Sequence, residues 1–239
     1  VWKGLTIDMT EPGFAPDRPF LLWVHGGGWD KGDKDAFRSE IEHFARRGYP
    51  CGSMQYRLST HAIFPAPWQD VCAAVRFVSR SWRRVILVGA SAGGHLVELA
   101  GLAAPPGEEP IETGRLADRG SDNPGPAVVA GIVSLAGVHD LRYGTMKALG
   151  FPFRRCYEAL LGGSMDDPLI QALAEQASPI AHLDRHRDRP CDCPPLLLLH
   201  GSEDRGVPVA LSQAMHQRCA SLGIACDLHL LPGSGHYIQ

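Results

Sequence analysis

A serine between small residues lies where an apolar strand turns at once into a helix. Val85–Val88 is a short apolar run, residues 89–93 read Gly-Ala-Ser-Ala-Gly, and a helical pattern begins at Gly94. Such an abrupt turn strains the backbone and requires small neighbours. It predicts that Ser91 lies at the carboxyl end of a parallel sheet, where open α/β folds bind ligands. The N–H groups at the start of the helix favour a negatively charged oxygen nearby.

Apolar runs and helical patterns alternate along the rest of the chain. The predicted strands are Phe20–Val24, Gly52–Tyr56, Val85–Val88, Val128–Ser134, Leu196–His200 and Cys226–Leu231, and the predicted helices are Ala36–Arg47, Asp70–Ser79, Gly94–Ala103 and Val209–Leu222. This order predicts an α/β fold with a mostly parallel central sheet and helices on both faces. A chain of 239 residues suffices for one such domain, residues 1–239.

Two segments interrupt the alternation. Residues 104–126 are rich in Pro, Gly and acidic residues, which is typical of a surface loop. Residues 141–188 are longer than a plain connection and contain helical patterns near Arg154–Leu161 and Asp167–Ala177. We expect the segment 141–188 to form a cap over a pocket. A decorative insertion is the alternative.

A second glycine-rich segment follows the first predicted strand. Residues 25–29 read His-Gly-Gly-Gly-Trp, and three glycines let the backbone approach a substrate closely. The N–H groups of Gly27 and Gly28, together with that of Ala92, are our candidates for an oxyanion hole. Trp29 is a candidate for substrate contact, with core packing as the alternative. Phosphate binding is disfavoured because the Lys-Ser/Thr pair that ends a P-loop is missing.

A serine hydroxyl needs a base, and the base needs an acid that fixes its tautomer. The loop after the fifth predicted strand supplies Asp204 as the candidate acid, with the neighbouring Glu203 as the fallback. The glycine-rich loop after the last predicted strand supplies His236, which can reach back to Ser91. The sequence therefore predicts a triad of Ser91, Asp204 and His236.

Eleven histidines are present, and most have a plainer interpretation than catalysis. We expect His25 to hold its loop, His95 to point away from the serine and His200 to pack at a strand end. His139 and His229 carry no functional signal. In the segment 141–188, two aromatic residues, Phe151 and Phe153, are candidates for a pocket wall, and packing is as good an explanation for them.

The composition argues against several kinds of partner. The formal net charge is −3 and the 23 Lys and Arg residues form no cluster, so no nucleic-acid partner is expected. No apolar run approaches the roughly 18 residues of a membrane-spanning helix. No histidines and acids have a metal-binding spacing such as HExxH, so we expect neither a metal nor another cofactor.

Cysteine usage bears on the compartment. The seven cysteines are odd in number and scattered, which indicates free thiols rather than a disulfide framework. We therefore expect a cytoplasmic protein. Because the chain begins at Val1 rather than at Met, a secretion signal that has been removed is the alternative.

Together these motifs resemble the α/β-hydrolase superfamily, and most closely its esterase branch with an HGGG-type loop. That branch includes hormone-sensitive-lipase-like, acetyl-xylan- or feruloyl-esterase-like and kynurenine-formamidase-like enzymes. The matching stretches are His25–Trp29, Tyr56–Leu58, Phe64-Pro65 with Asp70, Gly89–Gly94, Ser178-Pro179, His200–Pro208 and Gly235-His236. The resemblance implies a serine hydrolase that cleaves carboxylic esters of small molecules through an acyl-enzyme, without a cofactor. It also implies the triad and oxyanion roles named above.

The chain departs from the pattern at both ends. The N-terminal cap helices of the hormone-sensitive-lipase branch and the early edge strands are expected to be missing, and the chain stops three residues after His236. We therefore expect an α/β-hydrolase fold that is truncated at both ends. An amidase acting on N-formyl amides and a non-catalytic binding protein with this fold stay open as alternatives. The oligomeric state does not follow from the sequence.

Overall fold

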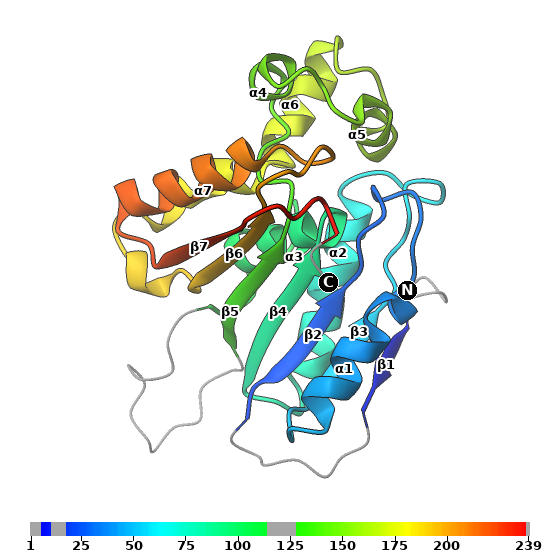
Figure 1. Cartoon of the computed structure of the whole chain (residues 1–239), viewed down its shortest axis with the longest axis vertical. Helices are drawn as coiled ribbons and strands as arrows, with labels where there is room; N and C mark the ends of the chain where they lie inside the picture. The colour runs from blue at the N-terminus through cyan, green and yellow to red at the C-terminus, as the bar shows by residue number, and fades with distance from the viewer. Residues whose placement is uncertain (1–5, 11–17, 114–127, 238–239) are drawn as a thin grey trace.

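The computed structural model describes residues 6–10, 18–113 and 128–237, which contain a mostly parallel sheet (Figure 1). Its strands follow the order β1-β3-β2-β4-β5-β6-β7. The strands are β1 (Ile7–Met9), β2 (Phe20–Val24), β3 (Cys51–Met54), β4 (Arg84–Ala90), β5 (Val128–Leu135), β6 (Leu196–Gly201) and β7 (Cys226–Leu231). Every neighbouring pair is parallel except β1 and β3. The predicted α/β fold with a mostly parallel sheet is confirmed.

An early edge strand is present, so the expectation that the early edge strands are missing was wrong for β1. This strand runs antiparallel to β3, with Ile7 opposite Met54 and Met9 opposite Gly52. Three residues are too few to show a twofold hydrophobic period, so the sequence alone gives no signal for this strand. Its pairing with β3 supplies the hydrogen bonds that define it.

The centre of the sheet is buried on both faces. All five residues of β2 are buried, because β2 lies between β3 and β4 and is covered from both sides. Its register places Leu22 opposite Leu87 of β4 and Gly52 of β3. Continuous apolar strands of this kind are typical of a parallel sheet between two layers of helices.

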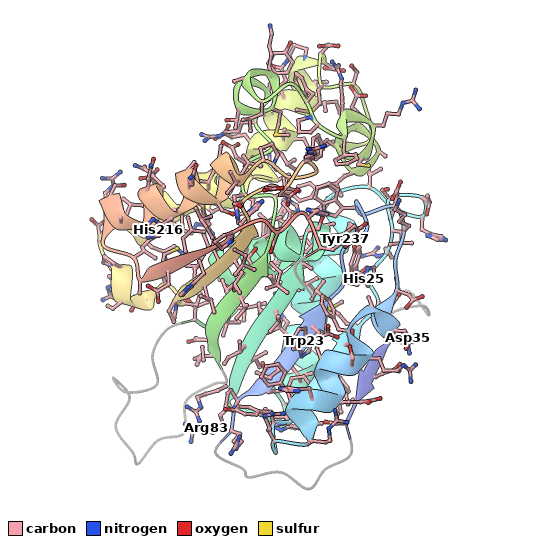
Figure 2. All side chains as sticks on the ribbon, in the orientation of Figure 1. Trp23, His25, Asp35, Arg83, His216 and Tyr237 are labelled. Carbon is pink, nitrogen blue, oxygen red and sulfur yellow. The ribbon has the colours of Figure 1, made fainter. Side chains whose placement is uncertain are left out.

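Helices cover both faces of the sheet, as predicted. The short 3₁₀ helix η1 (Lys34–Phe37) and α1 (Arg38–Ala45) lie on one face, where the ring of Trp23 (Figure 2) is 5.0 Å from that of Phe37 and 5.8 Å from that of Phe44. The other face carries the main apolar core, to which α2 (Ala66–Val78), α3 (Ala92–Leu102) and α7 (Val209–Leu222) contribute.

Several helix and strand ends differ from the predicted ones. The helix predicted from Asp70 begins at Ala66, because Pro67 occupies its first turn, where proline is well tolerated. The helix predicted from Gly94 begins at Ala92, directly after the serine. The predicted helix 36–47 is divided into η1 and α1. Beyond Leu102 no helix follows up to residue 113, and the rest of the predicted loop 104–126 lies outside the described residues.

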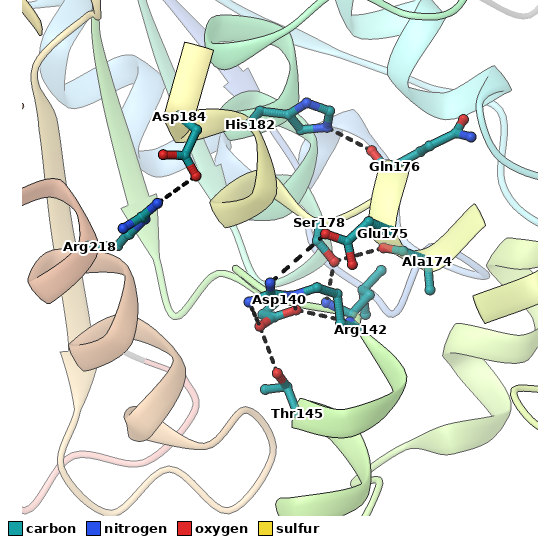
Figure 3. A network of polar contacts seen from close by, with 11 residues as sticks. Asp140, Arg142, Thr145, Ala174, Glu175, Gln176, Ser178, His182, Asp184 and Arg218 are labelled. Carbon is teal, nitrogen blue, oxygen red and sulfur yellow. Dashed lines mark hydrogen bonds and ion pairs between the residues drawn. The ribbon is translucent and has the colours of Figure 1, made fainter. Parts of the chain in front are cut away.

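The segment 141–188 contains α4 (Tyr143–Ala148), α5 (Arg154–Leu161), α6 (Pro168–Gln176) and the 3₁₀ helix η3 (Pro179–His186). Figure 1 shows α4, α5 and α6 grouped beyond one end of the sheet. The segment is fastened where it leaves and rejoins the domain. Ser178 Oγ accepts a hydrogen bond from the N–H of Leu141 at 2.8 Å, and Asp140 accepts bonds from the side chains of Arg142 and Thr145 (Figure 3).

Candidate active site

Ser91 occupies a strained turn between β4 and α3. Its φ of 52° and ψ of −117° lie in a region that non-glycine residues rarely adopt. Two backbone bonds hold the turn: the N–H of Ser91 donates to Leu135 at 2.8 Å, and the N–H of His95 donates to Ser91 at 3.1 Å. The turn leaves Ser91 half-buried, at the wall of a cavity.

The two glycines of the turn are required by close backbone contacts. A Cβ at Gly93 would overlap the carbonyl oxygen of Val24 in β2, and a Cβ at Gly89 would overlap the carbonyl oxygen of Gly93. Any side chain at either position would push α3 away from the sheet. The glycines therefore place the start of α3 directly behind Ser91.

The structure brings together the three residues predicted as a triad. His236 Nε2 lies 3.0 Å from Ser91 Oγ, and His236 Nδ1 lies 2.7 Å from Asp204 Oδ2. The Asp204 side chain is buried, whereas that of His236 is 23% exposed. An imidazole between a hydroxyl and a buried carboxylate can accept the hydroxyl proton while the carboxylate holds its tautomer.

The loop after β6 orients Asp204 rather than Glu203. Asp204 Oδ1 accepts hydrogen bonds from the N–H groups of Gly206 and Val207, at 2.7 and 2.9 Å. These bonds leave Oδ2 free to accept from His236. Glu203 is exposed, and its N–H donates to Ser234 at 2.9 Å, which fastens this loop to the loop that carries His236.

The glycine-rich loop after β2 turns its backbone next to Ser91. Gly27 and Gly28 have φ values of 112° and 60°, which favour glycine. Across residues 18–113 and 128–237, the N–H groups of Gly27, Gly28 and Ala92 donate no hydrogen bond to another part of the chain. Unpaired N–H groups beside a serine hydroxyl are suited to binding an oxyanion.

The buried side chain of His25 stabilises this loop. It is fully buried, its ring stacks on Tyr56 at 4.3 Å, and its Nδ1 lies 2.7 Å from the carbonyl oxygen of Gly26. Burial lowers the pKa of His25, so the neutral ring donates its Nδ1–H to that carbonyl.

Trp29 and His95 connect the glycine-rich loop to the segment 141–188. Trp29 is only 1% exposed, and its indole N–H donates to His95 Nδ1 at 3.2 Å. His95 Nε2–H donates to the carbonyl of Ala177 at 2.6 Å. Burial lowers the pKa of His95 to about 4, so the ring is neutral and bridges the two segments. Both ring nitrogens of His95 bond to residues other than Ser91, and this bridging role carried no sequence signal.

A cavity of about 310 Å³ opens beside Ser91 and His236. Its walls are mostly apolar and come from the glycine-rich loop, η1, α5 and the segment that follows β7. They include Trp29, Phe37, Leu135, Phe153, Cys156, Tyr157, Val207 and Tyr237, with Lys31 as the one Lys or Arg. The aromatic residue Tyr237 (Figure 2) is 88% exposed at the edge of the cavity.

Helix α5 supplies one wall of this cavity, which sequence reasoning found only in part. Phe153 lines the cavity, as expected for one of the two candidates, and is 60% exposed. Phe151 instead packs on Tyr143, with ring centroids 5.5 Å apart. Cys156 and Tyr157 also line the cavity and were missed, because a helical pattern does not show what its faces meet. Tyr157 belongs to the buried face of an amphipathic helix, which was the available signal.

In residues 6–10, 18–113 and 128–237, no group of three or more His, Cys, Asp or Glu side chains could hold a metal ion. No helix in those ranges is long and apolar enough to cross a membrane.

Comparisons with known proteins identify similar sequences. The BD-FAE family model matches residues 7–219, which is most of the chain but ends before His236. Esterase LipC of Mycobacterium tuberculosis is 28% identical over 230 residues, covering 91% of this chain and 52% of LipC. Esterase LipQ of the same organism is 29% identical over 243 residues, covering 95% of this chain and 52% of LipQ. The chain thus spans about half the length of these relatives.

Solved structures of an esterase share the fold. Thermogutta terrifontis esterase 2, phosphonylated by sarin, superposes with a TM-score of 0.71 and 21% identity, covering 97% of this chain and 80% of that one. Its apo form gives a TM-score of 0.70 at 22% identity, with the same coverage. At this level of identity the likeness shows the α/β-hydrolase fold.

Proposed function

We propose that this chain, which belongs to the BD-FAE family and has the α/β-hydrolase fold, is a carboxylic ester hydrolase. One observation carries the proposal. At the edge of a mostly apolar cavity, His236 lies in hydrogen-bond contact with both Ser91 and Asp204. Its Nε2 is 3.0 Å from Ser91 Oγ, and its Nδ1 is 2.7 Å from Asp204 Oδ2. This is the arrangement that makes a serine hydroxyl nucleophilic.

The proposed reaction proceeds through an acyl-enzyme. His236 Nε2 accepts the hydroxyl proton as Ser91 Oγ attacks the ester carbonyl, and Asp204 stabilises the imidazolium that forms. The N–H groups of Gly27, Gly28 and Ala92 bind the tetrahedral oxyanion. The C–O bond to the alcohol then breaks, and the alcohol leaves with the proton held by His236. Water attacks the acyl-enzyme in the same way and releases the acid.

The cavity supports small-molecule esters as the substrates. Its volume of about 310 Å³ lies at the lower end of the range for small-molecule sites. Its mostly apolar wall suits a short acyl chain or an aryl group. LipC and LipQ carry esterase names, and they favour an ester over the N-formyl amide that the sequence left open.

We further propose that the segment 141–188 acts as a cap on a single catalytic domain. Phe153, Cys156 and Tyr157 come from this segment and line the cavity. Trp29 lines the cavity but is only 1% exposed, so its contact with a substrate is small. A cytoplasmic location stays a prediction from the cysteine usage.

The test is a substrate panel measured on the wild-type protein and the Ser91→Ala variant. The panel contains p-nitrophenyl acetate and butyrate, sugar acetates, feruloyl esters and N-formylkynurenine. We expect turnover of esters by the wild type and a fall in kcat of at least about 10⁴-fold in Ser91→Ala. Unchanged turnover in clean variant protein contradicts the proposal. A kcat/KM highest for N-formylkynurenine makes the protein an amidase instead.

A further inference from the structure

Behind the acid of the proposed triad, a line of buried polar side chains continues into the core. It runs from Asp204 through His200 at the end of β6, Ser212 in α7 and His139 after β5 to Glu98 in α3. His200, His139 and Glu98 are 0% exposed and Ser212 is 1% exposed. Burying four polar side chains reduces the stability of the fold unless each of them is hydrogen-bonded.

The contacts along this line are short. Ser212 Oγ lies 2.7 Å from His200 Nδ1 and 2.7 Å from His139 Nε2. His139 Nδ1 lies 2.8 Å from Glu98 Oε2. Sequence patterns assigned His139 no role and His200 only a packing role. The four residues come from three elements and one loop, so no spacing along the chain reveals that they are neighbours.

The direction of each hydrogen bond follows from the acceptors around His200. Its Nε2 lies 2.9 Å from the carbonyl oxygen of Val207 and 3.2 Å from Asp204 Oδ2. Both are acceptors only, so Nε2 carries a proton. Burial lowers the pKa of His200, so the ring is neutral and Nδ1 is a bare acceptor. Ser212 therefore donates its hydroxyl proton to His200 and accepts the Nε2–H of His139.

The far end of the line holds one further proton. Because His139 Nε2 donates to Ser212, a proton must lie between His139 Nδ1 and Glu98 Oε2, on one atom or the other. Glu98 Oε1 is buried and has no hydrogen-bond partner in the part of the chain that the structure describes. Besides these groups, three titratable side chains in the described residues interact with this line: His236 beside His200, Cys226 of β7 beside Glu98, and His95 beside His139.

We propose that His200 is a positioning residue for Asp204, and that Ser212, His139 and Glu98 fix the His200 tautomer that carries its proton on Nε2, the nitrogen beside that carboxylate. The inference rests on the proposed function, because it assigns a role to residues behind its triad. It concerns the same carboxylate oxygen, Oδ2, that accepts the hydrogen bond from His236.

His200 acts on Asp204 in two ways. Its Nε2 lies 3.2 Å from Oδ2 while its N–H hydrogen-bonds the Val207 carbonyl, so the partial positive charge of the N–H group lies beside the carboxylate and stabilises its charge. The same N–H binds the carbonyl of Val207, whose own N–H donates to Asp204 Oδ1. His200 thus fixes both the charge and the orientation of the group that holds His236.

The first test reads the tautomer directly and does not depend on catalysis. ¹⁵N NMR of histidine-labelled wild-type protein at pH 7 distinguishes a protonated from a bare ring nitrogen, and a His200→Phe spectrum assigns the signals. We expect His200 as the neutral Nε2–H form. An Nδ1–H form of His200 overturns the proposal, even in a fully active esterase.

The second test compares two serines of α7. Ser212→Ala removes the donor to His200, whereas Ser221→Ala changes an exposed serine whose hydroxyl donates to the carbonyl of Arg218. With active sites counted by a fluorophosphonate probe, we expect kcat to fall about 10-fold in Ser212→Ala with KM unchanged. The acid limb of its kcat/KM profile should move to higher pH. Ser221→Ala should match the wild type. Wild-type kcat and pH profile in Ser212→Ala overturn the proposal.

A third variant separates positioning from simple packing. Glu98→Gln keeps the volume, and its amide N–H can donate to His139 Nδ1 in place of the shared proton. We expect Glu98→Gln to keep kcat within about threefold of the wild type and Glu98→Leu to lose about 10-fold per active site. Equal kcat in these two variants overturns the role proposed for His139 and Glu98, the two residues beyond Ser212. Absence of ester turnover by the wild type contradicts the proposed function. The NMR measurement would still test whether the buried residues fix the His200 tautomer.

Discussion

The hydroxyl of Ser91 lies 3.0 Å from Nε2 of His236, although 145 positions separate the two residues along the chain. Their meeting depends on the parallel order of β4, β5, β6 and β7, because each strand delivers its following loop to the same edge of the sheet. The loops after β4, β6 and β7 carry Ser91, Asp204 and His236.

Asp204→Asn should remove most of the activity without unfolding the protein. An amide in place of the carboxylate can favour the wrong tautomer of His236, and the change costs about 10⁴-fold in kcat in a comparable triad. The matched control is Glu203→Gln, which alters the exposed neighbouring acid and should keep kcat near that of the wild type. The measurement is kcat with p-nitrophenyl butyrate. A larger loss in Glu203→Gln than in Asp204→Asn contradicts the assignment.

Gly93→Ala should destabilise the domain strongly. The added Cβ would overlap the carbonyl oxygen of Val24, so α3 must move away from β2. We expect a loss of about 3 kcal/mol or more in the free energy of unfolding. Gly144→Ala in α4 is the control, because nothing lies within 4 Å of its added Cβ, and alanine should stabilise that helix by up to about 1 kcal/mol. Urea unfolding measures both changes, and equal midpoints would count against the close approach of α3.

His95 should make stability depend on pH between about 6.5 and 4. Its pKa is lowered to about 4 by burial, so in this range the unfolded chain binds a proton that the folded protein does not. The contribution of His95 to stability is therefore fully present above pH 6.5 and is lost as the pH falls to 4, by up to roughly 3 kcal/mol.

The check on His95 is the unfolding free energy measured at several pH values. His95→Gln keeps a side chain that can hydrogen-bond with Trp29 or Ala177 but does not titrate. This variant should show a shallower loss of stability from pH 6.5 to 4 than the wild type. If the free energy of unfolding falls equally with pH in the wild type and in His95→Gln, folding does not lower the pKa of His95.

Phe153→Ala should change substrate binding more than stability. The ring is 60% exposed and lines the cavity. A Cβ at Gly206 would lie 3.3 Å from Cε2 of Phe153 and 3.2 Å from Cγ of His236, so Phe153 lies near the ring of the proposed base. We expect KM for p-nitrophenyl butyrate to rise about threefold to tenfold, and Tm to stay within a few degrees of the wild-type value.

Phe77→Ala is the control for that variant. Phe77 is 50% exposed on α2 and does not line the cavity. Its truncation should leave KM unchanged. A similar rise in KM in both variants would show that Phe153 acts through general destabilisation rather than through the cavity.

The sequence predicted the parts of this protein whose signals are local. The strand, turn and helix around Ser91 are contiguous, and short apolar runs located the central strands within a few residues. The short strand β1 was missed because its pairing with β3, and not its own pattern, defines it. The loop after the fifth predicted strand suggested Asp204, and the glycine-rich loop after the last one suggested His236.

Other parts of the site depend on packing between distant segments. Nothing in the sequence of α5 shows that Cys156 and Tyr157 face the cavity, since this follows from where the helix lies. The line from Glu98 to His200 joins residues of separate elements that meet only in the folded core. A single sequence records neither relationship.

The most direct test of the central claim is titration of the protein with diethyl p-nitrophenyl phosphate, followed by peptide mass spectrometry. Attack by Ser91 Oγ forms the phosphoryl–serine bond and releases p-nitrophenolate. We predict a burst of about one p-nitrophenolate per chain, a diethyl phosphoryl group on Ser91, and no burst from Ser91→Ala. A burst that persists in Ser91→Ala, or phosphorylation of another residue, would contradict the account.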